Sequence, residues 1–439
     1  MSRTNILFVC YTGEFRLSSD GERWLCKVNM RLNKKEHEIK IRKCLLILQG
    51  MELPRNRVYH LSQALSNCGF IPIIITSKFF DSRDSRRPYD IKEFILPILL
   101  KRIPVLFPRQ LLLNFLVIPI IALLESPDII LISVPDGSPL LPTFISSKIL
   151  KKKLIIDIRD EWEEDMFNAL GRVGSLIKKM IYSIYSNANA LIVVTPSFLR
   201  KYKVLNSNTS LIFQGVDTDL FRPLPFEEVL SIKKTLGFTP DDFVIAYVGK
   251  LSPPYRLDIV LMALRILILR GRKKVKLLIV GKSGEKTRER IRESEIISIA
   301  NKLGIKDMVK VLPFTHQTKL AKYLGIADAG IIPYDHNPLW KNTIATKFYE
   351  YCACGLPVIV TAYKDSILAK IIDDNKIGLV CDPLDAEKLA NTIEKLIEDE
   401  SFRKKAGTMA RTLIEKEFSK EKLAERFINV IFKVLRENG

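Results

Sequence analysis

The sequence predicts an α/β protein that contains two doubly wound parallel sheets. The chain has 439 residues, which is enough for two or three domains rather than one. It is 47% hydrophobic and 27% charged, an ordinary globular balance with enough apolar material for two cores. Short runs of β-branched residues alternate with segments of helical periodicity in both halves. We therefore expect one domain over residues 44–222 and another over 223–410.

The first half opens with a β-α-β unit. Residues 44–48 form an apolar run that ends at Gln49-Gly50, as a buried parallel strand would. Val58, Leu61 and Leu65 carry helical spacing, and Gly69 is placed to end that helix. The next strand is expected at residues 71–76, followed by strands at 128–132, 153–157 and 190–194.

The second half repeats this alternation. Strands are expected near residues 243–248, 275–280, 309–312, 329–332, 358–361 and 378–380, with helices between them. Residues 411–439 are expected to form a C-terminal helix that could pack back on the first domain.

Residues 1–43 fit this scheme poorly. A first strand could lie at Ile6–Val9, but a second candidate begins at Cys44. An extension, a poorly ordered arm and a misplaced start all remain open for this leader.

Charge and cysteine content narrow the partners and the compartment. The formal charge of +20 is spread over both halves, which suits nucleic acid or an anionic membrane with a phosphate-bearing substrate. No nucleic-acid-binding module is recognisable, which favours the second partner and no nucleic acid. Seven cysteines without metal-site spacing indicate free buried thiols in a reducing compartment. With no secretory signal visible, we expect a cytoplasmic protein.

Residues 94–124 are unusually apolar for their place. Their longest apolar run, Phe115–Leu124, is too short to span a bilayer and contains Pro119. The segment is either a set of core helices or an interfacial surface over Phe94–Leu113. In the second case Lys101, Arg102 and Arg109 would meet anionic headgroups at the inner face of the cell membrane. The two interpretations weigh about equally.

The segment Thr346–Val358 carries the strongest functional signal. It predicts a short helix with one carboxylate, Glu350, ended by Gly355 and Pro357 before a buried strand. The first N–H groups of a helix lack internal partners, so a strand, a loop and a helix N-terminus together form a site for anions. An ordinary surface Glu is the alternative for Glu350 taken alone.

Three segments together resemble the retaining GT-B glycosyltransferases of glycosyltransferase family 4. Glu350 and the run Cys354-Gly-Leu-Pro-Val match the second Glu and the tail of that family's donor-binding signature. The segments 214–223 and 244–252 resemble its linker and the first strand of its C-terminal domain. Asn342 departs from the pattern, since the first Glu of the signature would fall there. Residues 347–351 are closer to a subgroup with the form Lys-x-x-Glu-Tyr.

The resemblance implies the GT-B fold, with two Rossmann-like domains facing each other across a cleft, and a nucleotide-sugar donor. Lys250 and Arg256 would hold the diphosphate, although Arg256 is shifted by one residue from the family's position. Glu350 would hold the ribose hydroxyls and Asn342 the donor sugar. Backbone N–H groups of the loop and first helical residue would also contact the donor; these residues are Thr343, Ile344, Ala345 and Thr346. The family's usual activity retains anomeric configuration and needs no metal or other cofactor.

The segment Asp157–Trp162 resembles an Asp-x-Arg-Asp-x-Trp motif of a subgroup that acts on lipid-linked acceptors. Arg159 stands where the family often has His, and Asp160 follows it. The resemblance makes Arg159 and Asp160 the candidate catalytic pair, with Asp160 orienting or deprotonating an acceptor hydroxyl. A helix N-cap is the alternative for Asp160.

The resemblance leaves three functions open. The first is transfer of a sugar to a glycan or lipid-linked acceptor. The second is a sugar-nucleotide epimerase of the same fold, which would release a free sugar product. The third is a non-catalytic glycan- or membrane-binding relative that has lost its first Glu and its His. Turnover of a sugar-nucleotide donor separates an enzyme from a binder.

Overall fold

The computed structural model describes residues 43–47, 57–77, 92–96, 107–134, 138–252, 254–283 and 293–436. The contacts divide the chain into two compact units. The first unit contains the described residues up to Val194, residues 199–211 and those from Ala424 onward. The second contains 195–198 and 212–423. Apart from Lys43, the leader lies outside the described residues, as do Lys101 and Arg102.

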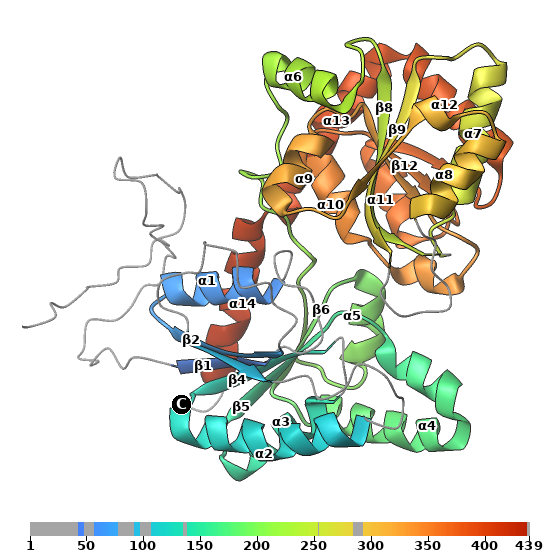
Figure 1. The fold of residues 1–439 in the computed structure, drawn as a ribbon. Coiled ribbons are helices and arrows are strands. Elements are labelled where there is room, and N and C mark those ends of the chain that lie inside the picture. The colour runs from blue at the N-terminus through green and yellow to red at the C-terminus, as the bar shows by residue number, and fades with distance from the viewer. Residues whose placement is uncertain are drawn as a thin grey trace, which may run out of the picture. The chain divides into compact units, whose positions relative to one another are not determined.

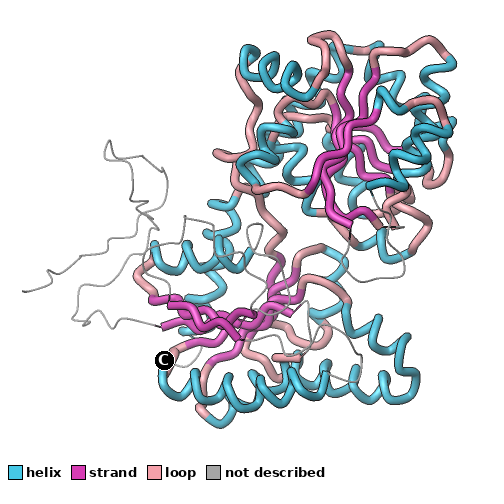
Figure 2. Tube along the Cα trace, in the orientation of Figure 1, coloured by secondary structure: helices cyan, strands magenta, loops and turns pink. Residues whose placement is uncertain are grey.

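The first unit is built on a sheet of seven parallel strands in the order β3-β2-β1-β4-β5-β6-β7 (Figures 1 and 2). Its elements in chain order are β1 (Lys43–Ile47), α1 (Arg57–Asn67), β2 (Ile71–Ser77), β3 (Lys92–Leu96), α2 (Phe107–Glu125), β4 (Ile129–Val134), α3 (Leu140–Ile149), β5 (Lys153–Ile158), α4 (Trp162–Ser186), β6 (Ala190–Val193), α5 (Pro196–Lys203) and β7 (Thr209–Leu211).

Helices cover both faces of this sheet. Helices α2, α3 and α4 lie along one face, and α1 and the final helix α14 (Lys420–Arg436) lie along the other (Figure 1). Phe432 of α14 meets Phe70, which precedes β2, with ring centroids 6.0 Å apart. The central strands β4 and β6 are mostly apolar and fully buried, and β5 is buried from Leu154 onward, as expected for parallel strands covered on both faces.

The order of the strands in the sheet reverses at β1. Strands β2 and β3 follow on one side of β1, and β4 then pairs with the other side of β1. In open α/β sheets, ligands bind at the carboxyl ends of the strands where the strand order reverses. This edge of the first unit is formed by the ends of β1, β4 and β5.

The second unit has a sheet of six parallel strands in the order β10-β9-β8-β11-β12-β13. Its elements are α6 (Phe226–Leu236), β8 (Phe243–Leu251), α7 (Leu257–Leu269), β9 (Val275–Ser283), α8 (Glu293–Lys302), β10 (Val309–Pro313), α9 (Gln317–Leu324), β11 (Ala329–Pro333), α10 (Thr346–Ala353), β12 (Val358–Thr361), α11 (Ile367–Asn375), β13 (Gly378–Cys381), α12 (Ala386–Glu398) and α13 (Glu400–Leu413).

Two apolar clusters sandwich this second sheet. One joins it to α7, α8 and α12, and the other joins it to α9, α10, α11 and α13. The strand order reverses between β8 and β11, so the ligand-binding edge of this unit is formed by the carboxyl ends of these two strands.

The predicted fold class of two doubly wound Rossmann-like domains is confirmed, and each predicted strand is present. Among the strands that the structure describes, two were missed, β3 and β7, which are the outermost strands of the first sheet. The expectation of core helices from Phe94 onward is wrong at its start, because residues 92–96 form β3 beside β2. Helix α2 begins only at Phe107.

The contact division falls after Leu211, where β7 ends, whereas the sequence placed it after residue 222. The segment that follows belongs to the second unit because Val216 pairs with Ser419 there. Residues of α14 from Ala424 onward belong to the first unit.

Candidate functional site

The site in the second unit begins at the N-terminus of α10. Ala345 occupies the cap position with φ −65° and ψ 141°, and its methyl group offers no capping hydrogen bond. Thr346 is exposed there. No side chain caps the start of α10, although the Phe348 N–H donates to the Ala345 carbonyl oxygen at 3.0 Å, and a helix start without a side-chain cap favours a bound anion. Thr343 differs from the expectation, since its N–H is directed at the Trp340 carbonyl oxygen at 3.5 Å.

The end of α10 follows the sequence prediction closely. Gly355 has φ 72°, a left-handed conformation that glycine adopts at little cost. The N–H of Leu356 donates to the Tyr351 carbonyl oxygen at 3.0 Å, which closes the last turn. The chain then enters the buried strand β12 directly. This short connection holds α10 against the sheet, and it therefore also sets the position of the N-terminus of α10.

Lys347 is a site residue that the sequence analysis did not select. Its side chain is buried, and its Nζ lies 3.6 Å from the ring centroid of Tyr255 and 4.2 Å from that of Tyr247. An ammonium over aromatic faces is stabilised by the quadrupole of the rings, whose faces are electron-rich. Only the Lys-x-x-Glu-Tyr resemblance pointed to this residue, because an isolated Lys in a sequence reads as a surface residue.

Gly249 brings the end of β8 up against this ammonium. A Cβ atom built on Gly249 would lie 3.1 Å from Lys347 Nζ, and Gly249 has φ 140°. A side chain at this position would both strain the backbone and crowd the lysine. The glycine therefore keeps the backbone of β8 close to Lys347.

Two loops are joined at the same edge. Tyr255 and Tyr334 form an antiparallel bridge, and the Arg256 N–H donates to the Pro333 carbonyl oxygen at 2.8 Å. Tyr334 stacks on Trp340 with ring centroids 4.3 Å apart, and Trp340 Nε1 donates to Asp335 Oδ1 at 2.6 Å. These contacts hold the carboxyl ends of β8 and β11 together beside α10.

Lys250 is exposed at the end of β8, as a phosphate ligand must be. Its carbonyl oxygen accepts a hydrogen bond of 2.6 Å from the Tyr247 hydroxyl, which fixes the backbone while the ammonium stays in solvent. Lys250 and Lys347 thus bring two positive charges to the edge formed by β8 and the start of α10.

Arg256 is already engaged by a carboxylate. Its Nε and Nη2 donate to the two oxygens of Asp258 at 2.8 and 2.5 Å, a bidentate pair. These hydrogen bonds hold the pKa of the Asp258 carboxyl below its ordinary value. To bind phosphate through this face, the guanidinium would have to leave Asp258.

Glu350 lies deeper than expected. The sequence placed it at an open cleft, whereas its side chain is only 2% exposed. It lies one turn inside α10. Burial raises the pKa of the nearby Cys354 thiol, and the negative charge of Glu350 raises it further. Ile344 and Ala345 are buried as well, and Asn342 is half-buried at the end of the 3-10 helix Pro338–Asn342. The predicted donor-binding residues thus surround one helix start in the second unit.

In the first unit, Arg159 and Asp160 follow β5 at the reversal edge of the sheet. Asp160 is exposed and Arg159 is half-buried. The N-cap alternative for Asp160 does not hold, because α4 starts at Trp162 and its cap position is Glu161, which makes no capping hydrogen bond.

The residues around Arg159 and Asp160 are firmly anchored. Glu161 pairs with Lys201 at 2.7 Å, and Glu163 accepts a hydrogen bond from the Tyr202 hydroxyl. Burial raises the pKa of the Glu163 carboxyl, and the hydrogen bond from Tyr202 opposes that rise. Arg159 and Asp160 therefore lie between the end of β5 and the paired residues Glu161 and Glu163, which restrict the movement of this segment.

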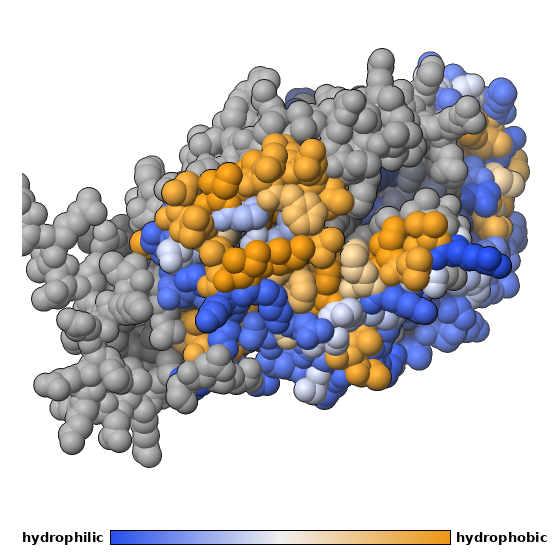
Figure 3. Space-filling view, turned by 90° about the horizontal axis from the view of Figure 1, so that it is seen from below, coloured by the Kyte–Doolittle hydropathy of each residue, from blue (hydrophilic) through white to orange (hydrophobic). Residues whose placement is uncertain are grey.

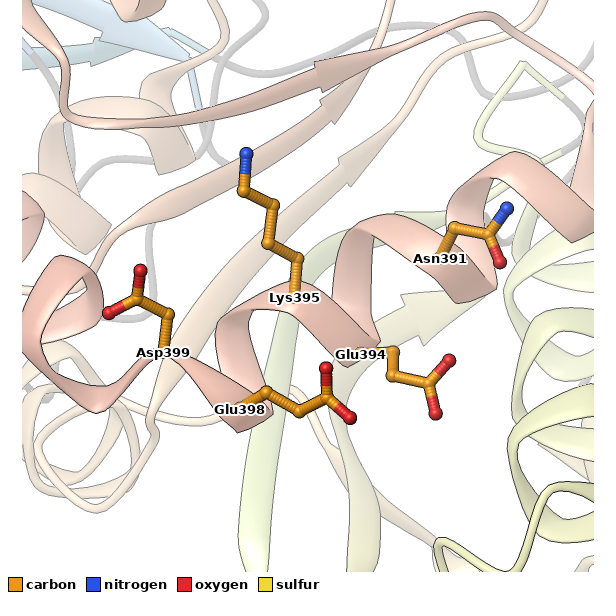
Figure 4. A pocket seen from close by; sticks show the side chains of 5 residues that line it. All are labelled: Asn391, Glu394, Lys395, Glu398 and Asp399. Atoms are coloured by element: carbon orange, nitrogen blue, oxygen red, sulfur yellow. The ribbon is translucent and has the colours of Figure 1, made fainter.

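A surface hollow in the second unit lies apart from these residues. It is lined by Asn391, Glu394, Lys395, Glu398 and Asp399. Figure 4 shows Lys395 extending away from Glu394 and Glu398. Arg272 donates to Glu394 at 2.9 Å and also to Glu398, while Arg270 donates to Asn391 at 2.7 Å. Asn391, Glu394 and Glu398 thus join α12 to the end of α7 through hydrogen bonds and ion pairs, which indicates a structural role.

A metal-binding cluster and a membrane-spanning helix are both absent from the described residues. No group of three or more His, Cys, Asp or Glu side chains gathers in them as a metal site requires. Within the same residues, no helix is both long and apolar enough to cross a bilayer.

Part of the chain matches a known protein family. Residues 229–413 match the model of the family described as Glycosyl transferases group 1, a span that contains Lys250, Arg256 and α10. The D-inositol 3-phosphate glycosyltransferase 2 of Catenulispora acidiphila is 27% identical over 201 residues, covering 46% of this chain and 45% of that protein. The enzyme of Segniliparus rotundus named D-inositol 3-phosphate glycosyltransferase is 30% identical over 183 residues, covering 42% and 38%. The chain thus spans less than half the length of these relatives.

Solved structures share the fold over nearly the whole chain. Sucrose-phosphate synthase of Thermosynechococcus elongatus superposes with a TM-score of 0.71 at 19% identity, covering 90% of this chain and 99% of that one. HepE of Anabaena, solved with UDP-glucose, gives a TM-score of 0.67 at 15% identity, covering 89% and 99%. At such identities the likeness establishes the fold and leaves substrates open.

Proposed function

We propose that this protein is a glycosyltransferase that moves a sugar from a nucleotide-diphosphate sugar to an acceptor. The observation that carries the proposal is the uncapped N-terminus of α10, with Lys347 and Glu350 on the helix and Lys250 at the end of β8. The match of this unit to Glycosyl transferases group 1 supports it, as does HepE, which was solved with UDP-glucose.

The second unit would bind the donor. As the bond from the anomeric carbon to the β-phosphate breaks, negative charge grows on the leaving diphosphate. Lys250 and the first N–H groups of α10 are fixed positive groups that would stabilise this charge. Glu350 would accept hydrogen bonds from ribose hydroxyls, and Asn342 would contact the donor sugar. Arg256 would contribute to phosphate binding only by exchanging Asp258 for the substrate.

The first unit would bind the acceptor. Asp160 is exposed at the reversal edge of its sheet and would orient or deprotonate the acceptor hydroxyl. The Asp-x-Arg-Asp-x-Trp and Lys-x-x-Glu-Tyr segments support membership of the corresponding family 4 subgroup, and with it retention of configuration. A glycan or lipid-linked acceptor is the class we propose. The curated relatives are named for a phosphate-bearing acceptor, inositol 3-phosphate.

A panel of sugar nucleotides tests the donor half of this proposal. A donor present at 100 times its dissociation constant should stabilise the folded protein by about 2.7 kcal/mol, seen as a higher melting temperature. Lys250→Gln should lose most of this shift, and Lys274→Gln, which alters an exposed lysine of the same unit, should keep it. Donor turnover must accompany binding. Release of a free sugar product without an acceptor would favour the epimerase, and binding without any turnover would favour the non-catalytic relative.

We also propose that the first unit docks on an anionic membrane at the inner face of the cell membrane. One face of α2 exposes large apolar residues at helical spacing: Leu112, Leu116, Ile120 and Leu123. Val173, Leu176 and Met180 of α4 are exposed as well. Figure 3 shows these apolar rows on the face covered by α2, α3 and α4. Such a surface exceeds what scattered apolar residues on soluble proteins present.

The charge beside these rows favours lipid over a second copy of the chain. Arg172 and Lys179 are exposed on α4, and Lys148 is exposed at the end of α3. Residues 171–186 contain no acidic residue. Two copies joined through this face would bring like charges together, whereas anionic headgroups would attract them. The sequence suggested a membrane-docking surface over Phe94–Leu113. We now propose that the docking surface is formed by α2 and α4 instead.

Sedimentation with vesicles tests this docking. The protein should sediment with anionic vesicles. It should be released as the salt concentration rises, because salt screens the attraction between the exposed basic residues and the anionic headgroups. The double variant Leu116→Glu and Ile120→Glu should abolish sedimentation without unfolding, since these side chains are 58% and 55% exposed. Leu269→Glu, at a leucine of the second unit that is 69% exposed, is the control. Equal binding to neutral and anionic vesicles would contradict the proposal.

A further inference from the structure

A buried group of charged residues lies at the reversal edge of the first unit. Arg57 is the first residue of α1, directly after the β1 connection, and Asp157 lies in β5 beside Ser133 of β4. Arg57 Nε is 3.3 Å from Asp157 Oδ2, and the Ser133 hydroxyl donates to the same oxygen at 3.2 Å. The Arg57 and Asp157 side chains are 2% and 0% exposed. Arg159 follows Asp157 by two residues.

The hydrogen bonding of this group is incomplete. Among the residues that the structure describes, Nε and Nη1 of Arg159 are buried and have no hydrogen-bond partner, and the same holds for Asp157 Oδ1. A buried polar group without a partner destabilises a protein, and a guanidinium more than a neutral group. In natural proteins an unpaired buried donor calls for an explanation, such as a bound ion, and an anion would supply the acceptors that the Arg159 nitrogens lack.

The acidic residues that follow Arg159 in α4 and its cap have partners of their own. Glu161 pairs with Lys201, and Glu163 accepts a hydrogen bond from Tyr202. The buried Arg159 nitrogens are donors that lack an acceptor, so they favour an anion.

We propose that Arg159, backed by the Arg57–Asp157 pair, binds a phosphate group of the acceptor. A phosphate offers several oxygens with up to two negative charges, and the planar guanidinium donates to such a group in bidentate fashion. The acceptor is then a phosphate-bearing compound with a free hydroxyl. This rests on the proposed function for its role in transfer, but phosphate binding at Arg159 can be tested by itself.

The test is a ³¹P NMR titration of the full chain with sn-glycerol 3-phosphate, with glycerol as the unphosphorylated counterpart. Arg159→Gln should weaken binding of the phosphate ester by about 10- to 100-fold, the loss expected for hydrogen bonds to a charged group. Lys250→Gln should leave it unchanged, because Lys250 belongs to the donor site of the other unit. Arg436→Gln, at an exposed arginine of the first unit, is the matched control.

Nucleotide-sugar binding is measured on the same variants, and Arg159→Gln should keep it. If Arg159→Gln fails to fold, Arg159→Lys takes its place; it retains the charge but loses the planar fork, and should bind with intermediate affinity. No phosphate-ester binding by the wild-type chain, or a loss confined to Lys250→Gln, would overturn the proposal even with donor binding intact. Phosphate binding that depends on Arg159, in a protein that binds no sugar nucleotide, would uphold the site while refuting the proposed function.

Discussion

Replacing Asp160 by Asn is expected to slow sugar transfer by roughly 10²- to 10⁴-fold, the usual contribution of a general base. The change keeps the size and shape of the side chain but removes its basicity. Asp160 is exposed, so the variant should fold as the wild type does. Donor affinity should stay near that of the wild type, because Asp160 and the donor-binding residues lie in different units. Initial rates at saturating donor, together with a donor dissociation constant, measure both quantities.

The control for this variant is Asp241→Asn. Asp241 is exposed in the second unit, where it pairs with Lys274 at 2.8 Å, and its replacement should leave transfer unchanged. Full turnover by Asp160→Asn would remove Asp160 from the chemistry. Equal losses of turnover and donor affinity would instead indicate a disturbed structure around β5.

The fold was largely predictable because its strands are buried on both faces. Such strands read as short runs of Ile, Val and Leu, and β4, β5 and β6 are of this kind. Strands β3 and β7 were not predicted, for two different reasons. Strand β3 begins with charged residues, Lys92 and Glu93, and β7 has only three residues, so neither carries a clear pattern. Helix α2 is apolar on nearly all sides, which hides the 3.6-residue period that identifies a surface helix.

The site was predictable only where a local segment encodes it. The start and end of α10 follow from Gly355, Pro357 and the apolar strand after them. Lys347 could not be selected, because the Tyr247 and Tyr255 rings that hold its ammonium come from a segment about a hundred residues away. Arg57 was missed in the same way, since it begins helix α1 and its partner Asp157 lies in strand β5, far along the chain. Sequence reasoning finds residues within a motif and misses pairs that only the folded sheet brings together.

Replacing Glu350 by Gln is expected to weaken donor binding by about 1.5–3 kcal/mol, the contribution of hydrogen bonds to a charged acceptor. Because the Glu350 side chain is buried, Glu350→Ala would leave a cavity beside α10 and lower the stability of the unit. A loss of donor affinity could then not be separated from a loss of stability. The amide of Gln keeps the volume and one acceptor oxygen while removing the charge that ribose hydroxyls would meet. Calorimetric titration with the preferred nucleoside diphosphate measures the effect without requiring an acceptor.

Glu227→Gln provides the matched control for this measurement. Glu227 is exposed in the first turn of α6 in the same unit, so its change should alter neither nucleotide affinity nor melting temperature. If Glu350→Gln lost stability but kept its nucleotide affinity, the carboxylate would serve the interior of the unit and not the donor. If it lost affinity at an unchanged melting temperature, the buried carboxylate would be reached by the nucleotide through the open start of α10. That outcome would make the helix start, and not the surface hollow beside α12, the donor site of this protein.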